Sequence, residues 1–238
     1  MHWIILAVAG YVAWRFVSKQ TSAPVARPAS SSDPTLRSEQ SGDEGEANVQ
    51  AELRAALSWL CGHDFYLHDG PLLLNHAPGT EFPTAEVDHL VITPFGIFVV
   101  ETKNWTGLIM PGHDDSSVER VGSDGRSEAR RSTLAQNRSK VRFLRSILPA
   151  VWPVESIAVF PNRNCELSPE LPVNLMGIHD LRQWLRVRMA LHEQRGRVRI
   201  NVISARAALL TLAETAPGAI QRHRDKLRKT PIKVTCSY

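Results

Sequence analysis

The stretch VDHLVITPFGIFVVETKN (residues 87–104) contains two apolar runs separated by a Pro-Phe-Gly turn. Short runs rich in Val, Ile and Phe on either side of a turn predict a β-hairpin. The hairpin carries Asp88 near one end and Glu101 and Lys103 near the other. Charged residues are rarely buried without a partner, so this hairpin is where we look first for a functional site.

The relative positions of these three side chains depend on the register of the hairpin. Alternate residues of a strand share a face, so Glu101 and Lys103 point the same way. Directly opposed residues of an antiparallel pair also share a face. Asp88 therefore joins them if it pairs with position 101 or 103, and faces away if it pairs with position 102. The Pro-Phe-Gly turn is compatible with several loop geometries, so the sequence leaves the register open.

In the favourable register, two carboxylates and one ammonium group converge. Two carboxylates are suitable ligands for Mg²⁺, which keeps open positions for water and phosphate. Such a cation polarises a phosphoryl oxygen and lowers the pKa of a bound water, and a lysine stabilises the developing negative charge. The pattern thus indicates phosphodiester hydrolysis. The alternative is an exposed Glu–Lys cross-strand contact, worth well under about 1 kcal/mol.

Helix-like and strand-like patterns interleave along the rest of the chain, which predicts an α/β or α+β fold with a mixed sheet. Helices are expected over residues 46–60, 132–148, 179–189 and 205–213, and extended segments over residues 65–74, 156–160, 173–177 and 198–203. The polar residues 112–131 are expected to form a loop or an irregular hairpin.

Several short motifs occur in a characteristic order: Gly45-Glu46, then Val87-Asp88-His89, then GIFVVETKNWTG (residues 96–107), then Gln136-Asn137. In this order they resemble the nuclease-related domain (NERD) family, a branch of the PD-(D/E)xK nuclease-like superfamily. The resemblance covers about residues 45–160. It implies a restriction-endonuclease-like core, a mixed β-sheet flanked by helices, and metal-dependent hydrolysis of DNA with Mg²⁺ or Mn²⁺.

The resemblance also implies roles for the residues at the matching positions. Asp88, Glu101 and Glu46 would be the metal ligands, Lys103 would support the attacking water, and Gln136 would orient a ligand or the substrate. Without the resemblance, each of these residues also has a less specific interpretation. An acid in the first turn of a helix, for example, is favoured by the helix dipole.

Other residues near these motifs have weaker assignments. Ser132-Thr133 stands where the family often has Asn-Pro, but Ser132 can still cap the following helix. Glu86 adds an acid close to Asp88. His89 is expected to point to the opposite face, as a structural residue.

Basic residues suggest where a polyanion could bind. The formal net charge is +4, and residues 222–233 contain six Lys or Arg and one Asp. Arg138, Lys140 and Arg142 are candidates for contacts with nucleic-acid phosphates, and the resemblance implies that the nucleic acid is DNA. The basic clusters could equally be a solvated helix face and a frayed tail, or could attract anionic lipid.

The two ends of the chain predict four segments. Residues 1–19 are rich in apolar side chains and predict a membrane anchor. We expect a flexible Ser- and Pro-rich linker at 20–44, a domain at 45–216 and a basic tail at 217–238 to follow it. Basic residues follow the apolar run and none precedes it, so we expect a single pass through a bacterial-type inner (plasma) membrane with the domain in the cytoplasm. A buried N-terminal helix is the alternative. Three dispersed cysteines argue against a disulfide framework or a zinc site.

Two other functions compete with a membrane-anchored nuclease. The same fold could bind nucleic acid without cleaving it, or it could serve as a scaffold for interaction with a membrane surface. The intact acids at positions 88 and 101 favour the enzyme.

Overall fold

The computed structural model describes the backbone of residues 34–229 and the side chains of residues 41–229 except Pro217. The predicted anchor, residues 20–33 of the predicted linker and the last nine residues of the predicted tail lie outside this range. No helix within residues 34–229 combines the length and the apolar character that a bilayer crossing requires.

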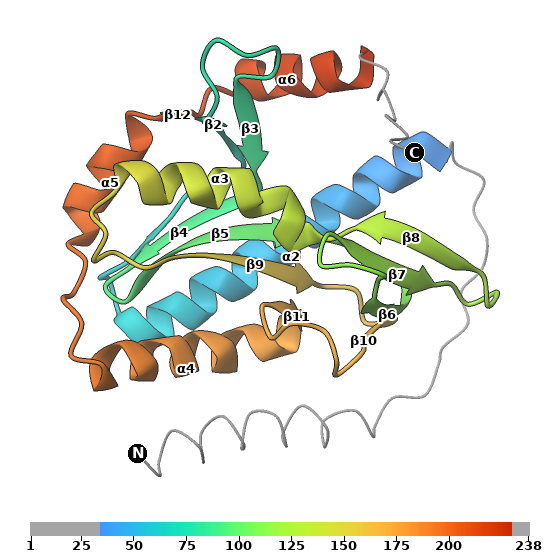
Figure 1. Ribbon diagram of the computed structural model, residues 1–238, viewed down its shortest axis with the longest axis horizontal. Helices are drawn as coiled ribbons and strands as arrows, with labels where there is room; N and C mark the ends of the chain where they lie inside the picture. Colours follow the sequence, from blue (N-terminus) through green and yellow to red (C-terminus); the bar gives the residue numbers. More distant parts are fainter. Residues whose placement is uncertain (1–33, 230–238) are drawn as a thin grey trace.

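A five-stranded mixed sheet forms the centre of the molecule (Figure 1), in the order β1-β4-β5-β9-β11. Its strands are β1 (Tyr66–Leu67), β4 (His89–Thr93), β5 (Gly96–Thr102), β9 (Val154–Phe160) and β11 (Leu175–Gly177). β4 pairs antiparallel with β1 and β5, whereas β9 pairs parallel with β5 and β11. The predicted hairpin is therefore β4–β5, and β5 is the central strand.

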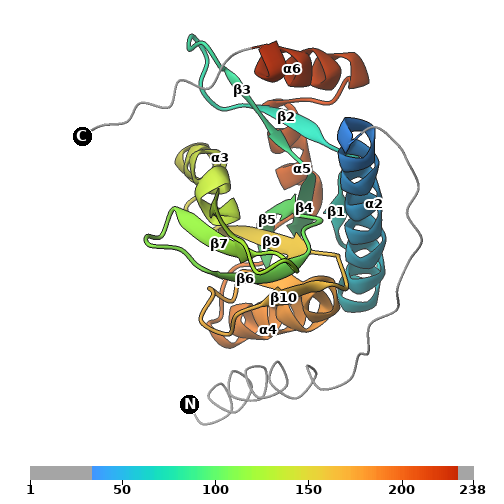
Figure 2. The same cartoon turned by 90° about the vertical axis from the view of Figure 1, so that its right-hand side faces the viewer.

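Helices cover both faces of this sheet (Figures 1 and 2). One face packs against α2 (Pro34–Cys61) and α4 (Leu181–Gln194), and the other against α3 (Thr133–Ile147) and α5 (Val202–Leu210). The alternation of β5 supplies both interfaces, because Phe98 and Val100 join the α2–α4 core while Ile97 and Val99 join the α3–α5 core. Every residue of β5 is buried, as expected for a central strand covered on both faces.

Two smaller sheets flank the central one. The first has the order β10-β6-β7-β8, and its strands are β6 (Gly107–Pro111), β7 (Ser117–Val121), β8 (Ser127–Arg131) and β10 (Cys165–Leu167). The second comprises β2 (Leu72–Asn75), β3 (Thr84–Val87) and β12 (Ala213–Glu214), and helix α6 (Pro217–Lys229) packs on it through Ala219, Ile220 and Leu73. A 3-10 turn, η2 (Ile178–Asp180), leads into α4.

Three segments differ from the sequence-based expectations. Helix α2 begins at Pro34, so residues 34–44 of the predicted linker are helical. Residues 217–229 form α6 rather than a frayed tail. The strand predicted over residues 198–203 is wrong, because Asn201 caps α5 by accepting a hydrogen bond from the Ser204 backbone N–H at 2.9 Å.

Helix α2 passes close to the end of β5 at Gly45. A Cβ atom at this position would lie 2.9 Å from Cβ of Asn104 and 3.3 Å from Cγ of Pro161. Asn104 in turn donates hydrogen bonds to the carbonyl and hydroxyl oxygens of Ser41, one turn earlier on α2. Gly45 therefore allows the close approach that places the neighbouring Glu46 beside the end of the central strand.

This close approach predicts opposite effects for two substitutions in the same helix. Gly45→Ala should destabilise the protein, because Asn104 or α2 must shift. Gly42→Ala should stabilise it by about 0.5–1 kcal/mol, because no atom lies within 4 Å of the added methyl group and alanine favours helix. Urea unfolding of the two variants measures this difference. Equal effects of the two substitutions would contradict the tight contact at Gly45.

Candidate active site

The β4–β5 register places Asp88 opposite Glu101. The last pair of this ladder is His89 with Val100, and the next opposed positions are 88 and 101. Asp88 lies in the one-residue break between β3 and β4, where its Oδ2 accepts a hydrogen bond from the Thr102 backbone N–H at 2.8 Å. Of the registers that the sequence left open, the favourable one is therefore present.

His89 and Thr102 occupy the other face of the hairpin. His89 is buried, its Nε2 lies 3.0 Å from Oγ1 of Thr102, and its Nδ1 lies 2.7 Å from Oε1 of Gln50 on α2. Burial lowers the pKa of His89 to about 4, so the ring is neutral near pH 7. The expectation that His89 is structural and points away from the acids agrees with this geometry.

Glu101 is a buried carboxylate held between two lysines. Its Oε1 accepts a hydrogen bond from Nζ of Lys103 at 2.8 Å, and its Oε2 accepts one from Nζ of Lys140 at 3.3 Å. Burial alone would raise the pKa of Glu101, but the two ammonium groups outweigh burial and lower it. Burial alone would likewise lower the pKa of Lys103, and the Glu101 carboxylate reverses that shift. Both groups are therefore charged at neutral pH.

Asp88 is in the opposite situation. Burial raises the pKa of Asp88 to about 8, the negative charge of Glu101 adds to the rise, and the Thr102 N–H only partly opposes it. Glu46 on α2 contributes to the same rise. The site thus contains more carboxylates than its lysines neutralise, and a proton on Asp88 relieves the excess negative charge.

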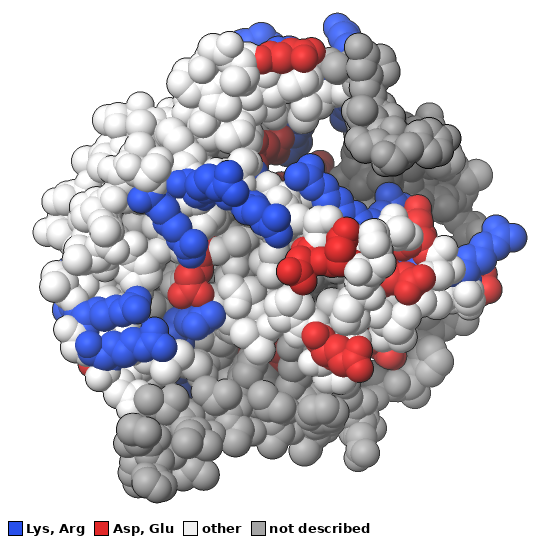
Figure 3. Space-filling model, in the orientation of Figure 1, with Lys and Arg blue, Asp and Glu red and all other residues white. Residues whose placement is uncertain are grey.

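Glu46 and Glu86 lie on the side of the site nearest α6. Burial raises the pKa of Glu46, and the guanidinium of Arg224 on α6 opposes this rise. Arg224 also binds Glu86, with Nε 3.0 and 3.1 Å from its two carboxylate oxygens. The extra acid next to Asp88 is therefore already neutralised. Figure 3 shows the surface hollowed between α3 and α6, with acidic side chains inside the hollow.

Helix α3 places the remaining predicted residues. Gln136 is partly buried and lies one turn before Lys140, so the two share the helix face that points to β5. The side chain of Gln136 has no hydrogen-bond partner among the described residues. Arg138 and Arg142 are exposed on another side of α3. Lys140 differs from the expected surface contact with phosphate, because it is 7 % exposed and bonded to Glu101.

Lys140 was not predicted to contact the acid cluster, which comprises Glu46, Asp88 and Glu101, although the sequence contains a signal for this contact. The buried face of α3 includes Thr133, Asn137, Lys140 and Leu144, which follow the 3–4-residue spacing of a helix. A lysine within that stripe must find a buried acid, and Glu101 is the acid that it meets.

The acid cluster is suited to a hard divalent cation that brings most of its own ligands. Oδ1 of Asp88 accepts no hydrogen bond from the described residues. The negative charge of Glu101 disfavours the ionised form of Asp88, and a bound cation would offset that effect. Among the side chains that the structure describes, no three of His, Cys, Asp or Glu are arranged as a ready-made metal cage. Mg²⁺ commonly binds through one or two carboxylates, water and substrate phosphate, so two carboxylates suffice.

Comparison with known protein families identifies the family of this chain. The family model described as nuclease-related domain matches residues 41–161, about half of the chain. The chain belongs to the nuclease-related domain family. No curated protein and no solved structure matches it. The part that matches the nuclease-related domain contains Glu46, Asp88, Glu101, Lys103 and Gln136.

The raised pKa of Asp88 predicts an unusual dependence of stability on pH. In the unfolded chain Asp88 titrates near 3.8, whereas in the folded chain it titrates near 8. Between these values the unfolded state binds fewer protons, so this group makes the fold less stable as pH rises. Asp88→Asn keeps a side-chain oxygen for the Thr102 N–H and removes the charge. In EDTA it should stabilise the protein by about 2 kcal/mol at pH 7.

The control for this experiment is Asp69→Asn, which removes a carboxylate whose side chain is 95 % exposed and should change stability little. Chemical unfolding at pH 4 and pH 7 measures both variants. The advantage of Asp88→Asn should shrink towards pH 4, where Asp88 stays protonated in the folded chain and the unfolded chain, titrating near 3.8, is partly protonated as well. A variant less stable than wild type at pH 7 in EDTA would show that Asp88 is not destabilised by burial.

Proposed function

We propose that this protein hydrolyses phosphodiester bonds of DNA with the help of Mg²⁺ or Mn²⁺. The observation that carries the proposal is the convergence of Asp88, Glu101 and Lys103 at the end of the β4–β5 hairpin, where Oδ1 of Asp88 accepts no hydrogen bond from the described residues. Membership of the nuclease-related domain family supports it.

Each residue has a role in the proposed reaction. Asp88 and Glu101 would bind the cation directly. Glu46 would bind it as a third ligand or through a bound water. A cation bound there would polarise the scissile phosphate and make a water more acidic. Lys103 is protonated at neutral pH, so it would stabilise negative charge on the phosphate rather than remove a proton from water. Gln136, from the first turn of α3, would orient the substrate.

Lys140 gives this site a second level of control. Its Nζ donates a hydrogen bond to Oε2 of Glu101, so a cation that binds this oxygen must displace Lys140 or share the oxygen with it. In the proposed enzyme Lys140 compensates the charge of Glu101 when no cation is bound. A Lys140→Met variant keeps most of the side-chain length and should bind Mn²⁺ more tightly than wild type.

The same contact favours a second candidate function. If Lys140 holds Glu101 permanently, the fold is a catalytically silent module that binds nucleic acid or, through its basic surface, a membrane. The proposed location is the inner membrane, with residues 1–19 as a single anchor and the domain in the cytoplasm, on the basis of the apolar N-terminal segment and the basic residues after it.

Cleavage assays separate the two candidate functions. The full-length chain should cut plasmid or linear DNA with Mg²⁺ or Mn²⁺ and not with EDTA. Asp88→Asn and Lys103→Met should each lower the rate at least about 100-fold, because the first removes a proposed cation ligand and the second removes a positive charge beside the reacting phosphate. Asp69→Asn and Arg126→Gln, which change exposed charges outside the acid cluster, should retain full activity.

Calorimetry with Mn²⁺ completes this test. Wild type should bind the cation, and Asp88→Asn and Glu101→Gln should bind it at least tenfold more weakly. A wild-type chain that neither binds Mn²⁺ nor cuts DNA, yet retains nucleic acid, would reject the enzyme and support the silent module.

A further inference from the structure

A surface groove runs along α3, beside the sheet. It has a volume of about 840 Å³ and lies between α3, the start of β9 and the loop that joins them. Its lining residues include Arg138, Arg142, Arg145, Trp152 and Arg197. Figure 3 shows basic side chains gathered over α3 and the surface below it, whereas acidic side chains lie over the β6–β8 sheet region.

Among the described residues, few acidic groups offset the positive charge of this groove. Glu155 is the acid in its lining, and Nη2 of Arg188 binds that carboxylate at 2.9 Å. Within the described part of the chain, the guanidinium groups of Arg138, Arg142 and Arg197 form no hydrogen bond or ion pair. Arginines without partners that line one groove are suited to binding a polyanion.

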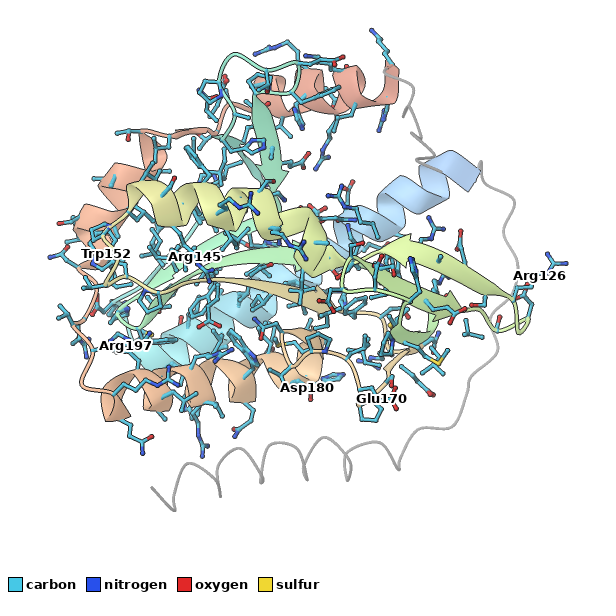
Figure 4. All side chains as sticks on the ribbon, in the orientation of Figure 1. Arg126, Arg145, Trp152, Glu170, Asp180 and Arg197 are labelled. Atoms are coloured by element: carbon cyan, nitrogen blue, oxygen red, sulfur yellow. The ribbon has the colours of Figure 1, made fainter. Side chains whose placement is uncertain are left out.

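Arg145 and Trp152 form the end of the groove farther from the first turn of α3. Arg145 is held in place because its guanidinium donates to the Val154 carbonyl oxygen at 2.6 and 3.0 Å, which leaves Nη1 available. Trp152 is half-buried in the α3–β9 loop. Figure 4 shows Arg145 between α3 and β9, with Trp152 and Arg197 towards the same end of the molecule. An aromatic ring beside arginines is the usual combination for stacking a base next to its phosphate.

The register of the sheet places the groove next to the acid cluster. Ser156, which lines the groove, pairs with Val99, and Ala158 pairs with Glu101. The floor therefore reaches to about 7 Å, or two residues along the strand, from the level of Glu101. The arginines from Arg138 to Arg145 span about 10 Å of helix, which is enough to contact more than one phosphate of a strand.

We propose that this groove binds a single-stranded segment of nucleic acid that leads into the acid cluster. The proposal deepens the proposed function, on which it rests for the direction of the strand, by naming the form of the substrate. Arg138, Arg142 and Arg197 contact successive phosphates, and Trp152 stacks on a base. A rigid duplex offers phosphates but no free base for Trp152, so the groove prefers an unpaired strand.

Fluorescence anisotropy of the full-length chain in EDTA tests the proposal without cleavage. The probes are a labelled fifteen-nucleotide oligo-dT, a duplex of the same length and vesicles containing phosphatidylserine. The Arg138→Gln/Arg142→Gln double variant should bind oligo-dT at least tenfold more weakly, and the slope of log affinity against log salt should fall by about 1.4. The control, Arg54→Gln/Arg126→Gln, removes the same charge from α2 and the β7–β8 turn and should change affinity less than twofold.

Trp152→Leu should weaken oligo-dT binding about tenfold, and Trp152→Phe should recover most of the loss. Equal loss of affinity in both double variants would overturn the groove as the binding site. Binding to the duplex or to vesicles as tight as to oligo-dT would overturn the single-strand preference. Unfolding curves of the variants show whether each is folded.

Failure of this inference and failure of the proposed function are distinguishable. If the arginine variants lose oligo-dT binding while the wild type cuts nothing with Mn²⁺, the groove stands and the enzyme fails. If the wild type cuts DNA and the arginine variants bind and cut equally well, the enzyme stands and the groove fails.

Discussion

The hydrogen bond from the Thr102 backbone N–H to Oδ2 of Asp88 holds the candidate site together. It continues the β4–β5 ladder by one step after the last backbone pair, and so fixes Asp88 opposite Glu101. A slip of one residue would turn Asp88 to the His89 face and leave Glu101 with its lysines alone. The fully buried β4 and β5 hold this register, because a slip would move every apolar side chain to the other core.

The electrostatics of the site follow from that constraint. Glu101 has two lysines within hydrogen-bond distance, and Asp88 has one backbone N–H and a carboxylate neighbour. Burial and the charge of Glu101 raise the pKa of Asp88, whereas the two ammonium groups outweigh burial and lower the pKa of Glu101. Glu101 is charged at neutral pH, whereas Asp88 becomes charged when a cation binds beside it. This division suits a site that must stay folded without its cation and gain a ligand when the cation binds.

Much of this arrangement could be predicted from sequence because it depends on periodicity. Alternation along residues 96–103 assigned Glu101 and Lys103 to one face, and the interleaved patterns predicted a mixed sheet between helices, as observed. What failed depended on contacts distant in sequence. The partnership of Lys140 with Glu101 joins residues 39 positions apart, and that of Arg224 with Glu86 joins residues 138 apart. Composition also misled at residues 34–44 and 217–229, whose polar sequences are helical.

The central claim is that Glu101 lies opposite Asp88 and that its negative charge repels an ionised Asp88, which adds to the effect of burial and keeps the pKa of Asp88 raised until a cation binds. Carbon-13 NMR titration of the Asp88 carboxyl in EDTA, in wild type and in Glu101→Gln, measures this repulsion directly. The account predicts a strongly raised pKa in wild type, a clear fall of that pKa in Glu101→Gln, and an ionised Asp88 at neutral pH when Mg²⁺ saturates the protein. An Asp88 that titrates near 4 in both proteins, and does not respond to Mg²⁺, would contradict it.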